Sequence, residues 1–131
     1  MSDLIFVYGT LMRGFDHPMS KLLASSADFL GDASCGGRLY MITHYPGLLH
    51  AAAEADIVHG DLFRMRDPDT LLAVLDDYES IGPEQEEPML YLRELLPVTL
   101  GDGSVVQAWT YIYNRPVDEA KRLASGRFLA P

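Results

Sequence analysis

The segment from residue 91 to residue 113 constrains the fold most strongly, because it is typical of two β-strands joined by a tight turn. Residues 91–100 (YLRELLPVTL) and 105–113 (VVQAWTYIY) are rich in aliphatic and aromatic side chains, and Gly101, Asp102 and Gly103 lie between them. An Asp-Gly pair between two apolar segments is a strong hairpin signal. The sequence therefore predicts a β-hairpin towards the C-terminus.

The other apolar segments predict further strands. Residues 4–8 (LIFVY) are continuously apolar, which indicates a strand buried on both faces. Strands are also expected at 38–43 and 57–65, the second with a bulge or a close backbone approach at Gly60. Turns are expected at 32–37 and 45–47, and the tail after Pro116 is either a short helix or frayed.

Two helices have recognisable start signals. The first is expected to end near residue 24, with Asp16 as its N-cap and Pro18 near its first position. The second covers 67–80, with Asp67 as its N-cap and a Gly-Pro pair at 82–83 as its end. The order β-α-β-β-α-β-β predicts one α+β domain over residues 1–131. Its mixed, mostly antiparallel sheet is expected to curl into a small barrel with two or three helices.

Composition and charge narrow the classes of function. The chain has 131 residues, 48% of them apolar, no apolar segment long enough to span a bilayer and no signal peptide. Cys35 is the single cysteine, so no intramolecular disulfide forms, and a cytoplasmic location is expected. The net charge of −9 disfavours binding to nucleic acid or to an anionic membrane. Neither Cys35 nor the four histidines have the spacing of a catalytic or metal-binding motif.

A carboxylate on the second helix is placed unusually. At roughly 100° per residue, the apolar positions at 71, 72, 74, 75 and 78 form one stripe, with Asp77 opposite it and Asp76 at its margin, where both can be solvated. Glu79 falls inside the stripe. Either the helix frays there and Glu79 turns to solvent, or burial and the neighbouring acids raise its pKa and suit it to proton transfer. A metal site is disfavoured, because adjacent helical residues diverge.

The end of the first strand offers a second candidate. Gly9 and Thr10 interrupt the apolar sequence between Tyr8 and Leu11. Such a turn is either a tight exit from the strand or a loop whose backbone N–H groups bind an anion. Neither a Walker A sequence nor a dinucleotide-binding glycine motif is present.

These segments resemble the γ-glutamylcyclotransferase-like, or AIG2-like, family in order along residues 4–113. The matching segments are FVYGTLMRG at 6–14, HYPGL at 44–48, VHGDLFRM at 58–65, LDDYES at 75–80 and YLRELLPVTLGDG at 91–103. The first of these is most similar to the γ-glutamylamine cyclotransferase branch. Ser80 stands where many members have glycine, and the loop at 80–90 is longer than in some members.

The resemblance implies a γ-glutamylcyclotransferase-like fold and a cofactor-free, metal-free reaction on a small γ-glutamyl amine or peptide. The substrate's α-amino group attacks its own γ-carbonyl, which gives 5-oxoproline and releases an amine. Glu79 is implied as the general base and acid, and Tyr8, Gly9, Thr10 and Leu11 as the substrate-binding loop. The alternatives are a non-catalytic ligand-binding member of this fold and a deprotecting cyclotransferase in a biosynthetic pathway.

Four further residues are given less specific interpretations. Tyr91 and Arg93 match family positions and are interpreted as structural, whereas Tyr111 and Tyr113 share one strand face and either line a pocket or pack. The leaving amine and the oligomeric state are left open by the sequence.

Overall fold

The structure is a computed structural model that describes residues 2–9, 11–12, 18–42, 45–78 and 91–128. Its strands are β1 (Leu4–Val7), β2 (Ala27–Gly36), β3 (Arg38–Met41), β4 (Pro46–Leu49), β5 (Ile57–Met65), β6 (Tyr91–Leu100) and β7 (Val105–Tyr113). Its helices are α1 (Pro18–Ser26), α2 (Pro68–Tyr78) and the 3₁₀ helix η1 (Glu119–Lys121).

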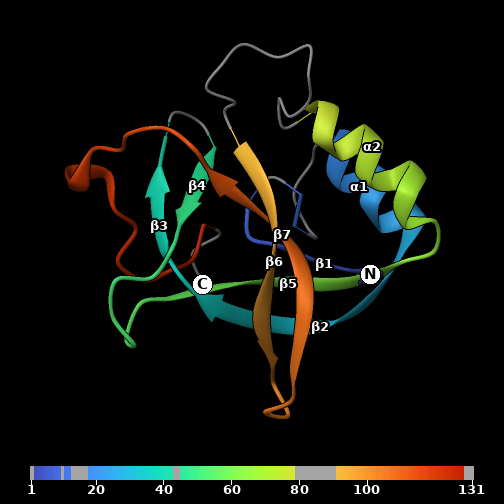
Figure 1. Cartoon of the computed structure of the whole chain (residues 1–131), viewed down its shortest axis with the longest axis horizontal. Helices are drawn as coiled ribbons and strands as arrows, with labels where there is room; N and C mark the ends of the chain where they lie inside the picture. Colours follow the sequence, from blue (N-terminus) through green and yellow to red (C-terminus); the bar gives the residue numbers. More distant parts are fainter. Residues whose placement is uncertain (1, 10, 13–17, 43–44, 79–90, 129–131) are drawn as a thin grey trace.

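A closed barrel forms the centre of the molecule, with strand order β1-β5-β2-β6-β7 (Figure 1). All neighbouring pairs are antiparallel except β1 and β7, which pair in parallel with Ile5 opposite Trp109 and so close the barrel. Strands β3 and β4 form a separate antiparallel pair. The predicted α+β fold, with a mixed and mostly antiparallel barrel, is therefore confirmed.

The apolar residues form two clusters because side chains of a strand alternate between its faces. On β1, Leu4 and Phe6 belong to the cluster inside the barrel, whereas Ile5 and Val7 belong to a second cluster outside it. The outer cluster includes Leu23 of α1 and three leucines of α2. Figure 1 shows the two helices side by side against one side of the barrel. Strand β1 is thus buried on both faces, as predicted.

The turns predicted at 32–37 and 45–47 are wrong for most of their residues, which lie in strands. Residues 32–36 belong to β2, whose small and polar residues carry no strand pattern and which is defined by its pairing with β5 along its whole length. Pro46 is the first residue of β4, where the missing N–H of proline is tolerated. A Cβ on Gly47 would lie 2.8 Å from Cβ of Tyr113, so glycine permits β4 to pack tightly on β7.

The hairpin and the fifth strand have the predicted bounds. Gly103 has a φ of +89°, which glycine adopts readily, and the N–H of Leu100 donates to the carbonyl of Ser104 at 2.9 Å. On β5, a Cβ on Gly60 would collide with the carbonyl oxygen of Val7. The close backbone approach predicted at Gly60 is confirmed, and the register irregularity lies instead in β2, at residues 29–31.

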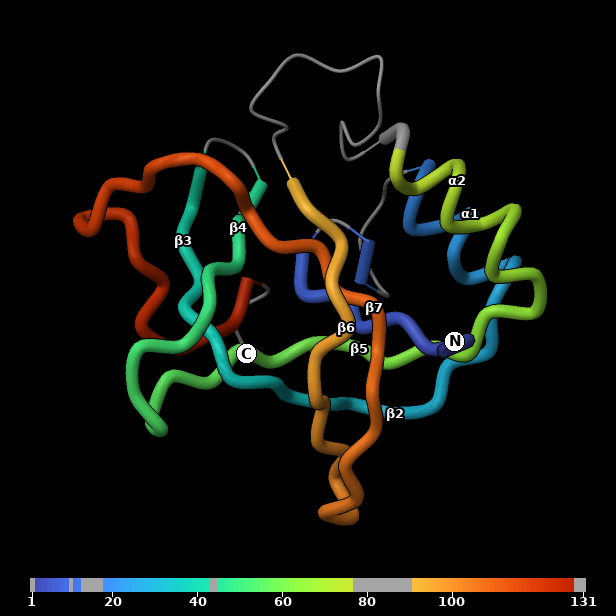
Figure 2. Tube along the Cα trace, in the orientation of Figure 1, coloured from blue at the N-terminus to red at the C-terminus, as the bar shows by residue number. Residues whose placement is uncertain are grey.

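The described part of the C-terminal tail, up to residue 128, is held against β3 and β5 rather than frayed (Figure 2). Its short helix η1 is followed by hydrogen bonds from Leu123 N to Leu39 O and from His59 N to Gly126 O, both 2.8 Å long. Arg122 also forms an ion pair with Asp56 at 2.8 Å. The short-helix alternative for the tail is therefore correct.

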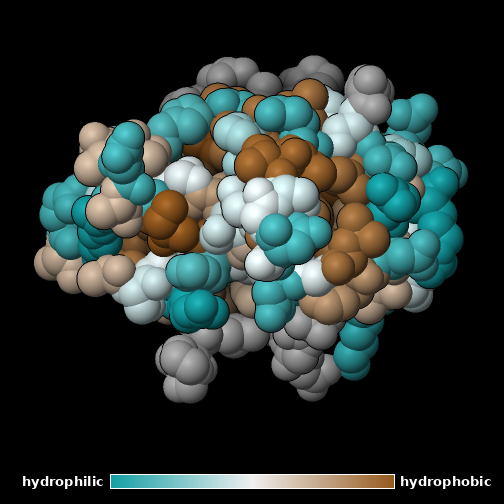
Figure 3. Space-filling view, turned by 90° about the horizontal axis from the view of Figure 1, so that it is seen from below, coloured by the Kyte–Doolittle hydropathy of each residue, from teal (hydrophilic) through white to brown (hydrophobic). Residues whose placement is uncertain are grey.

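The surface mixes apolar and polar areas. Figure 3 shows brown apolar side chains interrupted by hydrophilic ones on the face seen from below. The large apolar residues that remain exposed come mainly from strands: Phe29, Leu30, Ile57, Leu92, Leu95 and Val105. No helix in the described part of the chain is long and apolar enough to cross a membrane.

Candidate active site

Tyr8 directly follows β1, with its side chain buried and its hydroxyl bonded to two other strands. The hydroxyl donates to the carbonyl oxygen of Tyr111 on β7 at 2.7 Å and accepts from the N–H of Leu48 on β4 at 3.2 Å. Tyr8 therefore joins β1 to β4 and β7. Its predicted contact with substrate stays a prediction.

The turn after Tyr8 is tight and packed. Met12 N donates to the carbonyl of Gly9 at 3.0 Å, which closes a turn over residues 9–12. A Cβ on Gly9 would lie 2.6 Å from Cγ of Pro46, so only glycine fits there without a shift. Leu11 is 5% exposed and belongs to the outer cluster, and Thr10 lies outside the described residues.

Helix α2 faces the barrel with a different arc from the one predicted. Leu71, Leu72 and Leu75 are buried as expected, but Val74 is 41% exposed and the predicted inclusion of Val74 in the stripe is wrong. Asp76, expected at a solvated margin, has a side chain only 20% exposed. The inward face is therefore rotated towards Asp76. Glu79 lies outside the described residues.

Asp76 is the centre of a polar network that the sequence did not reveal. Arg93 of β6 donates to both carboxylate oxygens, from Nε to Oδ1 at 2.8 Å and from Nη2 to Oδ2 at 3.0 Å. The hydroxyl of Tyr111 donates to Oδ1 at 2.7 Å. Arg93 and Tyr111 are directly opposite each other in the hairpin, so both reach the same side of the sheet. In the sequence, the signal for this pairing was the register of the predicted hairpin, which places positions 93 and 111 opposite each other.

Arg93 is held from a second side by an aromatic ring. Its guanidinium carbon lies 4.4 Å from the ring centroid of Trp109, within the range of a cation–π contact. The indole N–H of Trp109 donates in turn to the carbonyl of Ser2 at 3.0 Å. The structural interpretation of Arg93 is thus supported, and its partner is a carboxylate of α2.

Three tyrosine rings form a group near Pro46, the residue that packs on Gly9. Tyr91 donates from its hydroxyl to the carbonyl of Pro46 at 2.7 Å, and its ring contacts those of Tyr45 and Tyr113. Burial, and secondarily the neighbouring Tyr45, raises the pKa of Tyr113. These tyrosines supply hydroxyl groups and apolar ring faces.

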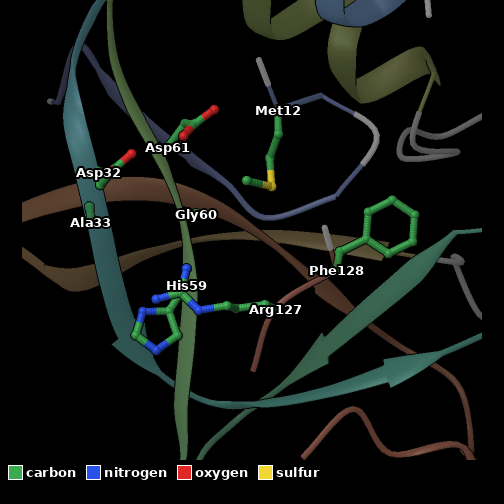
Figure 4. Close-up of a pocket in the computed structure, with 8 residues that line it drawn as sticks. All are labelled: Met12, Asp32, Ala33, His59, Gly60, Asp61, Arg127 and Phe128. Carbon is green, nitrogen blue, oxygen red and sulfur yellow. The ribbon is translucent and has the colours of Figure 1, made fainter. Parts of the chain in front are cut away.

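A separate small pocket lies between β2, β5 and the C-terminal tail (Figure 4). Its volume is about 140 Å³, and its lining residues are Met12, Asp32, Ala33, His59, Gly60, Asp61, Arg127 and Phe128. Figure 4 shows Asp32 and Asp61 towards one end and His59 with Arg127 towards the other. Burial, with a smaller effect of Arg127, lowers the pKa of His59. Met12 connects this pocket to the turn after β1.

Nucleophilic and metal chemistry have little support among the described side chains. Burial raises the pKa of the Cys35 thiol to about 12, so it is not a thiolate at neutral pH. Cys35 lies within β2 and not in the predicted turn. In the described part of the chain, no group of three or more histidine, cysteine, aspartate or glutamate side chains has an arrangement suited to a metal ion.

Comparisons with known proteins agree on one family. The family described as "Gamma-glutamyl cyclotransferase, AIG2-like" matches residues 5–130. The chain is 37% identical over 128 residues to the γ-glutamylcyclotransferase family protein YtfP of Escherichia coli K12, covering 95% of each chain. It is 33% identical over 107 residues to the human γ-glutamylaminecyclotransferase, covering 74% of this chain and 62% of the human one.

Solved structures agree on the fold. The crystal structure of an AIG2-like protein from Mus musculus superposes with a TM-score of 0.68 at 24% identity, covering 98% of this chain and 96% of that one. Fold and comparisons together define an enzyme of the γ-glutamylcyclotransferase type. The chain belongs to the γ-glutamylcyclotransferase, AIG2-like family.

Proposed function

We propose that the protein is a cofactor-independent γ-glutamyl cyclotransferase that releases 5-oxoproline and an amine from a small γ-glutamyl amine or peptide. The general activity follows from the family. The substrate class is suggested by the human relative, which is named a γ-glutamylaminecyclotransferase. We assign the general base and acid to Glu79, and the binding of the glutamyl group to the turn at residues 8–11.

The observation that carries this proposal is that the turn after β1 and the end of α2 share one buried cluster. Leu11, from the turn, and Leu75, from the last turn of α2, both belong to the cluster outside the barrel. They are distant in sequence, and their membership of the same outer cluster supports a site formed by the turn and the end of α2. Glu79 follows Leu75 by one helical turn in the sequence.

The inward arc of α2 adds support for Glu79. Taking Leu71 as zero and roughly 100° per residue, Leu75 lies near 40°, Leu72 near 100° and Asp76 near 140°. All three are directed towards the barrel, whereas Val74, near 300°, is exposed. A helical position 79 would lie near 80°, close to the middle of this inward arc. The corrected arc thus favours the inward alternative over the solvated one.

The proposed reaction needs one proton carrier and a folded substrate. Glu79 takes a proton from the α-ammonium, and the α-nitrogen then attacks the γ-carbonyl carbon to form a five-membered ring. The bond from that carbon to the leaving nitrogen breaks as Glu79 returns the proton to that nitrogen. The ring nitrogen then loses its second proton, which Glu79 passes to the released amine. Backbone N–H groups of the turn would stabilise the oxyanion that develops during attack.

The decisive experiment measures 5-oxoproline release from a panel of γ-glutamyl amines and dipeptides. Glu79→Gln keeps the size of the side chain but cannot carry a proton, and we expect kcat/KM to fall at least roughly 100-fold. Glu54→Gln, at an exposed position, is the matched control and should behave as wild type. Equal activity of wild type and Glu79→Gln would refute the assignment.

The substrate panel separates the proposed activity from its alternatives. Turnover of simple γ-glutamyl amines supports the proposal. Turnover confined to larger γ-glutamyl-protected intermediates would indicate a deprotecting enzyme. Binding of γ-glutamyl compounds without any release of 5-oxoproline would indicate a ligand-binding protein instead.

A further inference from the structure

We propose that Asp76 is a positioning residue for the cyclotransferase reaction. Its ion pair with Arg93 and its hydrogen bond from Tyr111 fasten the last described turn of α2 to the β6–β7 hairpin. The segment that leads to position 79 is thereby held at a fixed distance from the barrel. This inference rests on the proposed function, because it concerns the placement of the residue assigned as the base.

The location of Asp76 is unfavourable within α2 itself. The carbonyl end of a helix disfavours negative charge, and α2 has no basic residue in its last turn. A carboxylate at this position therefore needs stabilisation from another element. Arg93 of β6 supplies a cation, and the two side chains are only 20% and 23% exposed. Local helix stability does not explain an aspartate here, whereas attachment to the hairpin does.

The geometry of the network defines the position of the carboxylate closely. Arg93 contacts both oxygens with its planar fork, which restrains the carboxylate in distance and in orientation. Trp109 covers the guanidinium from another side. Three protein donor atoms reach the Asp76 carboxylate, and this arrangement suits it to hold α2 against the hairpin.

Tyr111 connects this anchor to the turn after β1. Its hydroxyl donates to Asp76, and its own carbonyl accepts the hydroxyl of Tyr8 at 2.7 Å. One residue of β7 thus holds both the end of β1 and the end of α2. A shift of either segment changes the separation between the substrate-binding turn and the end of α2, and catalysis is sensitive to displacements near 1 Å.

Asp76→Asn tests the inference directly. The amide is the same size as the carboxylate but carries no charge, and one of its two terminal atoms is a donor that faces the donors of Arg93. We expect kcat to fall roughly 10- to 100-fold with KM within about twofold, because the end of α2 is displaced while the substrate's own contacts remain. Circular dichroism and thermal unfolding would establish that the assayed variant is folded.

Two milder variants keep the test decisive if Asp76→Asn does not fold. Tyr111→Phe removes one hydroxyl, and Arg93→Lys keeps the charge but loses the two-point contact. Each should lower kcat several-fold at unchanged KM. In the double variant Tyr111→Phe/Asp76→Asn, the fold-reduction in kcat should be smaller than the product of the two single reductions. Asp28→Asn breaks the exposed Asp28–Arg66 pair, 2.9 Å long, and should leave kcat unchanged.

The outcomes are distinct from those of the Glu79 test. If Glu79→Gln loses activity while the folded Asp76→Asn enzyme keeps wild-type kcat, the positioning role is wrong and the proposed function stands. For Asp76→Asn, a rise in KM equal to the fall in kcat/KM would also overturn the positioning role, because such a rise would indicate that Asp76 contacts the substrate. If Glu79→Gln remains fully active, the proposed base is wrong whatever Asp76→Asn does.

Discussion

At the scale of single residues, environment decides which reactive side chains are available. Cys35 and Asp76 illustrate the two outcomes. Cys35 is 4% exposed within the barrel cluster, where desolvation disfavours its thiolate. Asp76 is partly buried too, but Arg93 and Tyr111 compensate its charge. Partners thus let the Asp76 carboxylate keep its charge in a partly buried position, whereas burial keeps the Cys35 thiol unreactive.

Thiol labelling checks the state of Cys35. With a pKa of about 12 against the usual 9.0, the thiolate fraction at pH 8 is roughly a thousandfold lower than for an ordinary thiol. We expect negligible alkylation of the folded protein by iodoacetamide at pH 8 and complete reaction in urea, measured by mass spectrometry. Rapid labelling of the folded protein, or loss of 5-oxoproline release in Cys35→Ala, would contradict this.

At the scale of secondary-structure elements, close backbone contacts between strands determine the shape of the barrel. Strand β5 pairs with both β1 and β2, and it passes so near β1 at Gly60 that no side chain fits. The residues facing that contact, Val7 and Phe6, are almost fully buried. Because β1 leads directly into the turn that we propose to bind substrate, the spacing of β1 and β5 also sets where that turn lies.

Gly60→Ala tests this contact. The new methyl group would collide with the carbonyl oxygen of Val7, a backbone atom that moves only if the β1–β5 pairing is disturbed. We expect the free energy of unfolding in urea to fall by roughly 3 kcal/mol, the upper range for overpacked cores. Gly101→Ala is the matched control, since a Cβ there meets nothing within 4 Å. Equal stability of the two variants would show that β5 can retreat from β1 at little cost.

At the scale of the whole molecule, the C-terminal tail joins the β3–β4 pair to the barrel. Tyr40 donates to Glu119 at 2.6 Å, and Arg122 reaches Asp56 in the segment before β5. The hydrogen bond from Arg122, and next that from the N–H of Ala52, lower the pKa of Asp56. The tail therefore stabilises the fold through a contact that depends on pH.

The pH dependence of Arg122→Gln has a definite sign. Asp56 has a lower pKa folded than unfolded, so its stabilising effect is present above the unfolded value of 3.8 and is lost as the pH falls through the folded pKa. Wild type should be more stable than Arg122→Gln at pH 7, and the difference should disappear in strong acid. For Lys121→Gln, on the same tail, the difference in stability from wild type should not change in this way with pH. Thermal unfolding from pH 2 to pH 7 would reveal a constant difference if Asp56 were not involved.

The sequence by itself determined the elements whose signals are local. The Gly-Asp-Gly turn defined the β6–β7 hairpin, and the Asp67-Pro68 start defined α2, because turn and capping preferences act between residues a few positions apart. The five motifs, read together, also identified the family.

Only the tertiary structure decided what depends on partners far apart in the chain. Strand β2 has no strand pattern of its own and exists through pairing with β5. Helical angles placed Asp76 at a solvated margin, but the hairpin brings Arg93 and Tyr111 to it and rotates the buried face of α2 towards them. The physical reason is that charge compensation and strand pairing are gained only when distant segments meet, so nearby residues carry no signal of them.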